Sequence, residues 1–171
     1  TLLTLAIIGI ASVPLLLRIK FPSSPLLAIV FVALVIRVPH MQESFWYDES
    51  FSAAVASVSF EELPHAIVAD VHPPAYYWLL WHIAQSSTDE AWLRFPALIA
   101  GLASVVMMYH IAHELTPRHL MQYQVALTAA FITAILPGHI RYSTEARAYM
   151  MMALFVQIAL YAILTNKRRL L

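Results

Sequence analysis

An acidic pair with aromatic neighbours is the first group of residues that could do chemistry. It lies in Trp46-Tyr47-Asp48-Glu49-Ser50, just beyond an apolar run of the sequence. A carboxylate at a lipid boundary loses hydration, and this loss favours the uptake of a proton, as a general base requires. Taken alone, such a pair is more often part of a solvated loop, because charged side chains prefer water.

Two further segments place a cation beside a predicted helix. His72 precedes two prolines, which are tolerated in a first turn, so a helix is predicted to open at Ala75. The free N–H groups at the start of such a helix favour an anion. Arg94, in the segment 92–96, lies at the mouth of a later apolar run. The alternatives are a simple proline-capped helix start for His72 and an Arg94 that reaches lipid headgroups.

The segment 141–149 forms the fourth group and carries Tyr142, Glu145 and Arg147. The planar guanidinium group matches the oxygens of a phosphate, so arginine beside Glu and Tyr indicates an anion site. An ion pair that anchors a helix at the membrane interface explains the same residues equally well. Arg37, near the end of an earlier apolar run, completes the cations expected at this membrane boundary.

The composition predicts the elements that must position these residues. Hydrophobic residues make up 61% of the chain and charged residues only 12%, with a mean hydropathy of +0.71. Soluble domains carry about 25% charged residues. Nothing alternates with a period of two, and open sheets cannot span lipid. The sequence therefore predicts an all-α, polytopic bundle of transmembrane helices.

Charge and cysteine content exclude several functions. The formal net charge is zero, so no basic field indicates a nucleic-acid partner. The absence of cysteine excludes disulfides, thiolate zinc sites and a cysteine nucleophile.

A spanning helix needs about 20 mainly apolar residues. Residues 1–17 are a weak candidate for an extra span, because Gly9 and Pro14 interrupt them. We interpret the whole chain, 1–171, as a single N-terminal transmembrane module of a longer protein. The four better candidate spans are residues 26–38, 95–111, 123–137 and 148–164.

Residues 39–92 differ from these runs because acidic and aromatic residues alternate with short apolar stretches. This mixture is typical of amphipathic helices at a membrane surface. The stretch 75–84 is too short to span a bilayer unaided, so we predict a juxtamembrane helix, with a short or tilted span as the alternative.

The positive-inside rule orients the predicted spans. With this count of spans, loop 39–92 and segment 138–147 share the outer face, so Asp48 and Arg147 are expected to meet there. The basic residues that define the cytoplasmic side are at 18, 20, 118 and 167–169.

The order of the four groups is more specific than any one of them. From about Leu26 to Leu164 the chain resembles the N-terminal half of the glycosyltransferase C superfamily, in particular bacterial RgtA/B/C/D-like transferases. These are related to protein O-mannosyltransferases and aminoarabinose transferases. The motifs that carry the resemblance are Tyr47-Asp48-Glu49, His72-Pro73-Pro74-x-Tyr76-Tyr77, Leu93-Arg94-Phe95-Pro96 and Tyr142-Ser143-x-Glu145-Ala146-Arg147-x-Tyr149.

The resemblance implies a role for each matching residue. Asp48 would be the general base that takes the proton of an acceptor hydroxyl, with Glu49 in support. His72 stands where the aminoarabinose transferases have a lysine that contacts the carrier phosphate, and it would hold that phosphate with a dependence on pH. Arg94 and Arg147 would hold the same anion. The segment 1–17 is a departure, because family members usually start with the helix that follows it.

The implied reaction is an inverting transfer of a sugar from a polyprenyl-phosphate carrier to a glycan, lipid or protein acceptor. The implied location is the outer face of a bacterial inner membrane. Specificity is expected to depend on later helices and outer domains, so residues 1–171 alone are expected to be inactive.

Three other functions remain as alternatives. A metal-dependent oligosaccharyl-type transferase would use His65, Asp70 and His72, or Asp48 with Glu49, as ligands. Their spacing fits no compact metal motif, so no cofactor is expected. A transporter should bury charges at mid-bilayer, and the predicted spans carry none there. A scaffold would leave the outer-face groups without a purpose.

Overall fold

The computed structural model describes residues 24–68, 74–117 and 121–167, and within these ranges it contains helices and no strand. The all-α prediction is confirmed for this part of the chain. The weak span 1–17 and His72 lie outside the described residues. The elements are α2 (Ser24–Arg37), the 3-10 helix η1 (Val38–Gln42), α3 (Tyr47–Ala56), α4 (Leu63–Val68), α5 (Pro74–Ala84), α6 (Glu90–Leu115), α7 (Gln122–Ile135), α8 (Pro137–Tyr142) and α9 (Tyr149–Lys167).

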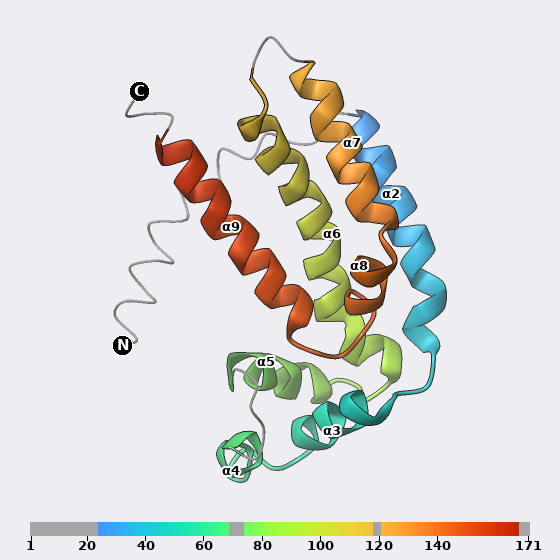
Figure 1. Ribbon diagram of the computed structural model, residues 1–171. Coiled ribbons are helices and arrows are strands. Elements are labelled where there is room, and N and C mark those ends of the chain that lie inside the picture. The colour runs from blue at the N-terminus through green and yellow to red at the C-terminus, as the bar shows by residue number, and fades with distance from the viewer. Residues whose placement is uncertain (1–23, 69–73, 118–120, 168–171) are drawn as a thin grey trace.

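Four helices lie side by side as a bundle, with α6 between α9 on one side and α7 and α2 on the other (Figure 1). Small buried residues let these helices approach closely, as is common in membranes. A side chain at Gly101 of α6 would collide with the Cβ of Ser143, so glycine permits the segment after α8 to lie against α6. The core between α2, α6 and α7 consists of Leu26, Ala33, Val105, Ala130 and Ala134.

Among the described residues, three stretches are long and apolar enough to cross a membrane: residues 24–42, 90–115 and 149–166. Helix α7, with 14 residues, is shorter. The predicted spans 26–38, 95–111 and 148–164 overlap these stretches, although the ends of the helices differ from the predicted ends.

The start of α6 and the end of α2 differ from the predicted ends for a physical reason. Helix α6 begins at Glu90 rather than 95, because Asp89 and Glu90 complement the positive end of a helix. Pro96 lies inside α6 and does not end it. Likewise, α2 passes into η1, which includes Pro39 in its first turn, where proline needs no hydrogen-bonding N–H. Arg94 therefore lies within a helix, and the loop begins later than Pro39.

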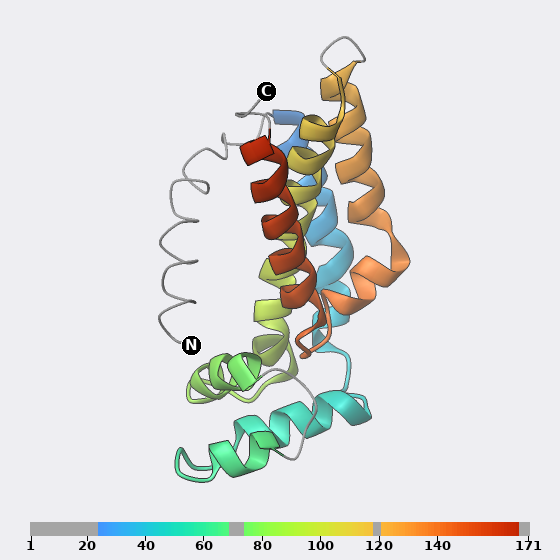
Figure 2. The same cartoon turned by 60° about the vertical axis from the view of Figure 1, so that its left-hand side comes forward.

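Helices α3, α4 and α5 form a platform across one end of the bundle (Figure 2). Helix α3 packs on α5 through an apolar core that includes Val55 and Tyr77. The indole Nε1 of Trp81 donates to the carbonyl of Val58 at 3.0 Å, which ties α5 to the loop after α3. Because α5 lies across the bundle end rather than alongside its helices, its placement fits the juxtamembrane prediction and not the tilted span.

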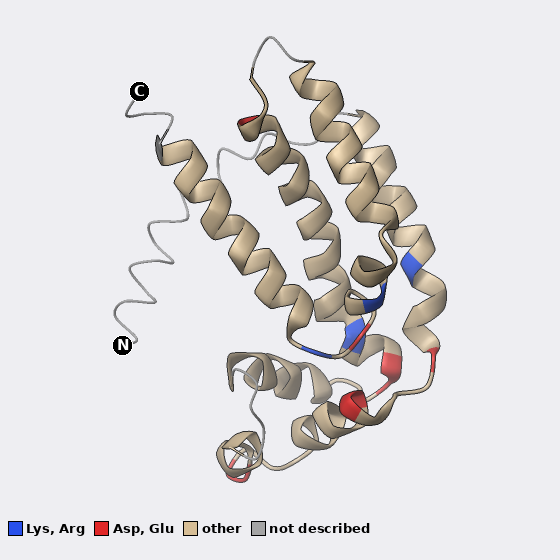
Figure 3. Ribbon diagram, in the orientation of Figure 1, with Lys and Arg blue, Asp and Glu red and all other residues tan. Residues whose placement is uncertain are grey.

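Charged residues gather where the platform meets the bundle (Figure 3). The middle of each long helix in the described ranges carries no charged residue. Glu114, near the other end of α6, and the two acids just before α4, Glu61 and Glu62, lie apart from this group. Charges are costly inside a bilayer, so this end of the molecule is where polar chemistry can take place.

Candidate functional site

A buried ion pair joins the platform to the bundle. Glu49 lies in the first turn of α3, where a carboxylate complements the free N–H groups of the helix. The Nε and Nη2 atoms of Arg94, on α6, donate to its two oxygens at 2.8 and 2.7 Å. The exposed fractions of Glu49 and Arg94 are only 1% and 2%, so the pair is almost entirely shielded from water.

Further hydrogen bonds engage the remaining polar atoms of Glu49 and Arg94. The Oε1 atom of Glu49 also accepts the backbone N–H of Ala146 at 2.7 Å, and Oε2 accepts that of Trp46 at 3.5 Å. The Nη1 atom of Arg94 donates to the backbone carbonyls of residues 40, 41 and 43. The pair therefore fixes α3, α6, the turn after η1 and the segment before α9 to one another.

Arg94 was expected either to hold a phosphate or to reach lipid headgroups. It does not reach headgroups in the structure, because its guanidinium group is enclosed by Glu49 and by backbone carbonyls. Since all three of its nitrogens are engaged within the protein, we interpret Arg94 as a positioning residue. The phosphate-binding role stays a prediction and does not enter the proposal below.

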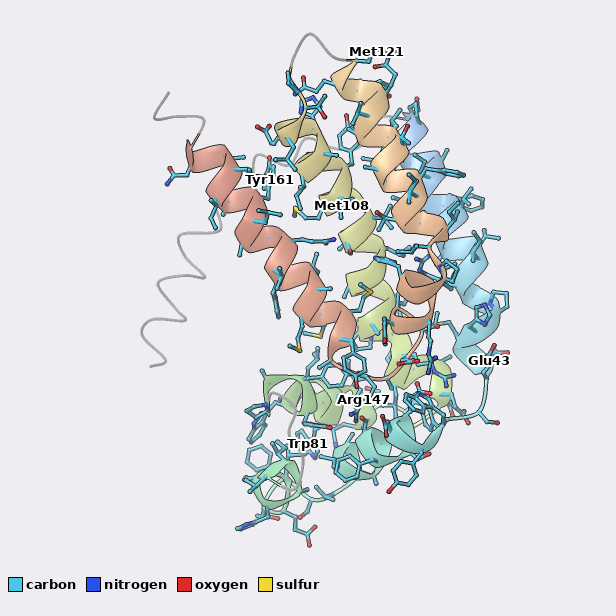
Figure 4. The ribbon with its side chains drawn as sticks, viewed as in Figure 1. Glu43, Trp81, Met108, Met121, Arg147 and Tyr161 are labelled. Atoms are coloured by element: carbon cyan, nitrogen blue, oxygen red, sulfur yellow. The ribbon has the colours of Figure 1, made fainter. Side chains whose placement is uncertain are left out.

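Arg147 reaches from the segment before α9 into the platform. Its Nη1 atom donates to the backbone carbonyl of Asp48 at 3.2 Å, to Ser52 Oγ at 3.1 Å and to the Tyr77 hydroxyl at 3.5 Å. Figure 4 shows Arg147 between the end of the bundle and helices α3 and α5. The expectation that Asp48 and Arg147 meet, although far apart in the sequence, is confirmed.

Asp48 differs from its neighbour Glu49. It is half-buried, and no described residue donates a hydrogen bond to its carboxylate. Its backbone, in contrast, is fixed by Arg147 and by the hydroxyl of Ser52, which donates to the Asp48 carbonyl at 3.2 Å. The site therefore holds two different carboxylates. The oxygens of Glu49 are all hydrogen-bonded within the described part of the protein, whereas Asp48 has a fixed backbone and a carboxylate that is available to a ligand.

Tyr76 closes the apolar side of this site. Its ring is buried, and its hydroxyl has no hydrogen-bond partner among the described residues. Burial, together with the negative charge of Glu49, raises the pKa of Tyr76, so the phenol remains protonated. A buried phenol of this kind can donate a hydrogen bond but cannot act as a base at neutral pH.

A cavity of about 520 Å³ opens on the other side of the ion pair, between the turn after η1 and helix α8. Glu145 and Arg141 form an ion pair in its wall, with Arg141 Nε donating to Glu145 Oε1 at 2.7 Å. Glu145 was predicted to bind substrate, and the structure places it here rather than beside Asp48. The lining residues are His40, Glu43, Ser44, Trp46, Glu49, Arg94, Pro137, Ile140, Arg141, Thr144 and Glu145.

Arg37 belongs to a separate network inside the bundle. Its exposed fraction is 0%, and Nε donates to Ser143 Oγ at 2.7 Å while Nη1 donates to the carbonyls of Ala33 and Ala134. Arg37 was expected among the cations of the substrate site. In the structure it is closed off from any ligand, because neutral protein groups surround it, and we interpret it as structural.

His139 completes this network from α8. The Nη2 atom of Arg37 lies 2.8 Å from His139 Nδ1, and His139 Nε2 lies 3.0 Å from Ser104 Oγ. Arginine can only donate, so Nδ1 accepts and the proton of the neutral ring is on Nε2. Burial, and next the charge of Arg37, lower the pKa of His139 to about 4, which keeps the ring neutral.

The remaining predicted residues are placed as follows. Tyr142 is exposed, and its ring lies edge-on to Tyr149 with centroids 5.3 Å apart, outside the lining of the cavity. Asp70 and His72, two members of the alternative metal set, lie outside the described residues. Within the described ranges no group of three His, Cys, Asp or Glu residues could hold a metal ion.

Sequence reasoning missed several residues of the site. Ser52 and Tyr77 contact Arg147, and His139 with Ser104 extends the network of Arg37. The pair Tyr76-Tyr77 stood within a quoted motif and could have been assigned to the site. Ser52 carried no signal, because a serine within a short amphipathic helix has many ordinary explanations.

The fold and the site define a class of protein. Long apolar helices, with most of the described charged groups toward one end, make this an integral membrane protein of the multi-helix type. The sequence matches the family described as "Dolichyl-phosphate-mannose-protein mannosyltransferase" over residues 71–169, which is more than half of the chain. The chain belongs to this family of membrane glycosyltransferases, and the resemblance to the glycosyltransferase C superfamily is confirmed.

The extent of the match bears on the site. It includes Arg94, Glu145 and Arg147 on or between helices α6 and α9, and it begins after Asp48 and Glu49. No curated protein and no solved structure matched the chain. The acidic pair therefore rests on the geometry and on the motif resemblance.

Proposed function

We propose that the protein transfers a sugar from a polyprenyl-phosphate carrier to an acceptor hydroxyl, with Asp48 as the general base. The observation that carries this proposal is the contrast at the start of α3. The carboxylate of Asp48 accepts no hydrogen bond from the described residues, while the neighbouring Glu49 accepts four. An acceptor hydroxyl can therefore donate to Asp48, whereas Glu49 has no oxygen left to receive it.

The proposed step is a single displacement. Asp48 removes the proton of the acceptor hydroxyl as the hydroxyl oxygen attacks the anomeric carbon of the donor. The bond between that carbon and the carrier phosphate oxygen breaks, so the configuration inverts and the phosphate leaves with the bonding electrons. Because negative charge grows on the phosphate, fixed cations beside it stabilise the transition state.

Arg147 is the described cation best placed for this role. It is anchored to the Asp48 carbonyl and to Ser52, so its charge lies within reach of a phosphate bound beside Asp48. His72, which stands in the phosphate-binding position of the motif, is the second cation of the proposal. The reaction would take place on the outer face of a bacterial inner membrane, the orientation that the positive-inside rule favours.

The Glu49–Arg94 pair would position these groups. It holds the first turn of α3 against α6 and against Ala146, the residue before Arg147. A displacement of about 1 Å at a reacting group can cost about 100-fold in rate. The buried pair therefore acts on catalysis through the placement of Asp48 and Arg147.

The test replaces Asp48 with Asn in the full-length enzyme, which removes the base and keeps the shape. Transfer from a panel of polyprenyl-phosphate sugars should fall by about 10²–10⁴-fold, the usual contribution of a general base. The matched control is Glu61→Gln, an exposed acid on the far part of the platform, which should transfer at the wild-type rate. Near-normal transfer by Asp48→Asn, with normal expression, would remove Asp48 from the mechanism.

A further inference from the structure

The cavity beside Glu145 differs in character from the site of Asp48 and Arg147. Neither Asp48 nor Arg147 lines it. A phosphate would meet a wall that carries three carboxylates, those of Glu43, Glu49 and Glu145, against two guanidinium groups. Arg94 is committed to Glu49 and to backbone carbonyls, and Arg141 gives its Nε to Glu145, so the Nη atoms of Arg141 are the guanidinium donors left for a ligand. The charges of this wall therefore do not favour an anion.

A metal ion also fits this cavity poorly. Glu49 and Glu145 in its wall are each paired with a guanidinium group, that of Arg94 or Arg141, with which a cation would have to compete. The residues that the structure describes contain no group of three suitable ligands. The chemistry that remains is that of a neutral ligand with many hydrogen-bonding groups.

Glu145 supplies the acceptor that such a ligand needs. Its exposed fraction is 6%, and its Oε1 atom accepts from Arg141. Its Oε2 atom is buried and has no hydrogen-bond partner within the described ranges. An unsatisfied carboxylate oxygen costs free energy. The terminal torsion of a glutamate is soft, so a small rotation can turn this oxygen toward a hydroxyl in the cavity.

Trp46 and Arg141 supply the remaining wall. The indole of Trp46 is partly exposed, and the guanidinium group of Arg141 lies 5.6 Å from its ring centroid. The Arg141 side chain has an exposed fraction of 65%, and among the described residues Glu145 and the indole of Trp46 are the side chains that hold it in place. A ring with hydroxyl groups can donate to Glu145, accept from Arg141 and lay its C–H face on the indole. The volume of about 520 Å³ lies within the usual range of ligand pockets.

We propose that this cavity binds a neutral polyhydroxylated ring and that Glu145 accepts a hydrogen bond from one of its hydroxyls. The proposal deepens the proposed function, because either the sugar of the donor or a glycan acceptor can provide such a ring. It does not require turnover, so binding can be measured even if Asp48 is not the base.

The experiment uses the full-length protein in nanodiscs and a panel of neutral methyl glycosides, observed by saturation-transfer NMR. At least one glycoside should bind to the wild type. Glu145→Gln should weaken its binding by about tenfold, because the amide oxygen can still accept but the charge that strengthens the hydrogen bond is lost. Glu61→Gln makes the same change of acid to amide on an exposed surface outside the cavity and should leave binding unchanged.

A second measurement covers the case in which Glu145→Gln fails to fold. Monodeoxy analogues of the bound glycoside are titrated into the wild type, and one of them should bind at least about tenfold more weakly than the others. Competition then identifies the source of the ring. Displacement by the polyprenyl-phosphate sugar, but not by the sugar-free carrier, assigns the cavity to the donor; displacement by a glycan acceptor assigns it to the acceptor.

Two results would overturn the proposal. One is that no methyl glycoside binds to the folded wild-type protein. The other is that Glu145→Gln and the wild type bind every glycoside equally. Loss of transfer by Asp48→Asn together with either of these results would reject the sugar cavity and keep the transferase.

Discussion

Arg94 and Arg37 are both enclosed within the helices, but the partners that surround them differ. Arg94 is neutralised by the carboxylate of Glu49, and the same contact fixes the turn that carries Asp48. Arg37 is surrounded by neutral groups, namely two carbonyls, the hydroxyl of Ser143 and the ring of His139.

The difference shows where a buried charge indicates function in a membrane protein. Both arginines have their nitrogens engaged by protein groups, so neither can bind a ligand without losing contacts. Function is expected instead at groups near the Glu49–Arg94 pair that are held in position but have a carboxylate oxygen without a hydrogen-bond partner among the described residues. These groups are Asp48 and the Oε2 atom of Glu145. The network of Arg37 has no such group among the described residues that contact it, and we interpret it as a joint between α2, α7 and α8.

The largest effect on stability is expected from Glu49→Ala. This change leaves Arg94 buried without a counter-charge, and breaking a buried pair in this way costs about 3–5 kcal/mol. Thermal unfolding of the full-length protein in detergent measures the loss. Glu43→Ala, which removes an exposed acid near the same turn, should change stability by less than about 1 kcal/mol. Equal effects of the two changes would contradict the structural role of the Glu49–Arg94 pair.

Arg37→Met and Arg147→Ala test whether the network of Arg37 is structural and whether Arg147 belongs to the substrate site. Arg37→Met removes hydrogen bonds that join three helices and should cost about 2–3 kcal/mol of stability, while the KM for the donor in the folded enzyme stays unchanged. Arg147→Ala should raise the KM for the donor by about tenfold or more, because a charged contact to the phosphate is worth about 1.5–3 kcal/mol.

Steady-state kinetics on protein purified as a monodisperse fraction distinguishes these outcomes. An increase in the KM for the donor in Arg37→Met would place Arg37 in the substrate site after all. An unchanged KM in Arg147→Ala would remove Arg147 from the phosphate site.

Much of the fold could be predicted from the sequence because membrane helices are recognised by the length and hydrophobicity of their segments. The meeting of Asp48 with Arg147 was also predictable, since the side of the membrane limits which segments can touch. The pairing of Glu49 with Arg94 was not predictable, because it depends on how α3 is rotated against α6, and composition does not encode that rotation. The same limit applies to Arg37, which was counted among the cations of the membrane boundary because it lies near the end of a predicted span.

The smallest effect concerns the pH dependence of the Arg37 network. An unfolded histidine has a pKa of about 6.5, whereas His139 has a pKa of about 4 in the folded protein. Between these values the unfolded chain binds the proton more tightly, so stability is lost as the pH falls from about 6.5 toward 4. At pH 5 the expected loss relative to pH 7.5 is about 1–2 kcal/mol, reduced from the full shift because the ring is only partly buried.

The measurement compares unfolding temperatures at pH 7.5 and 5 for the wild type and for His139→Asn. Asparagine keeps a hydrogen-bond acceptor near Arg37 but cannot be protonated in this range. The variant should therefore be less stable than the wild type at pH 7.5 and should lose less stability on acidification. Other groups also titrate between these pH values, so the decisive quantity is the difference between the two proteins. If both lose the same stability on acidification, His139 does not bind its proton differently in the folded and unfolded chains.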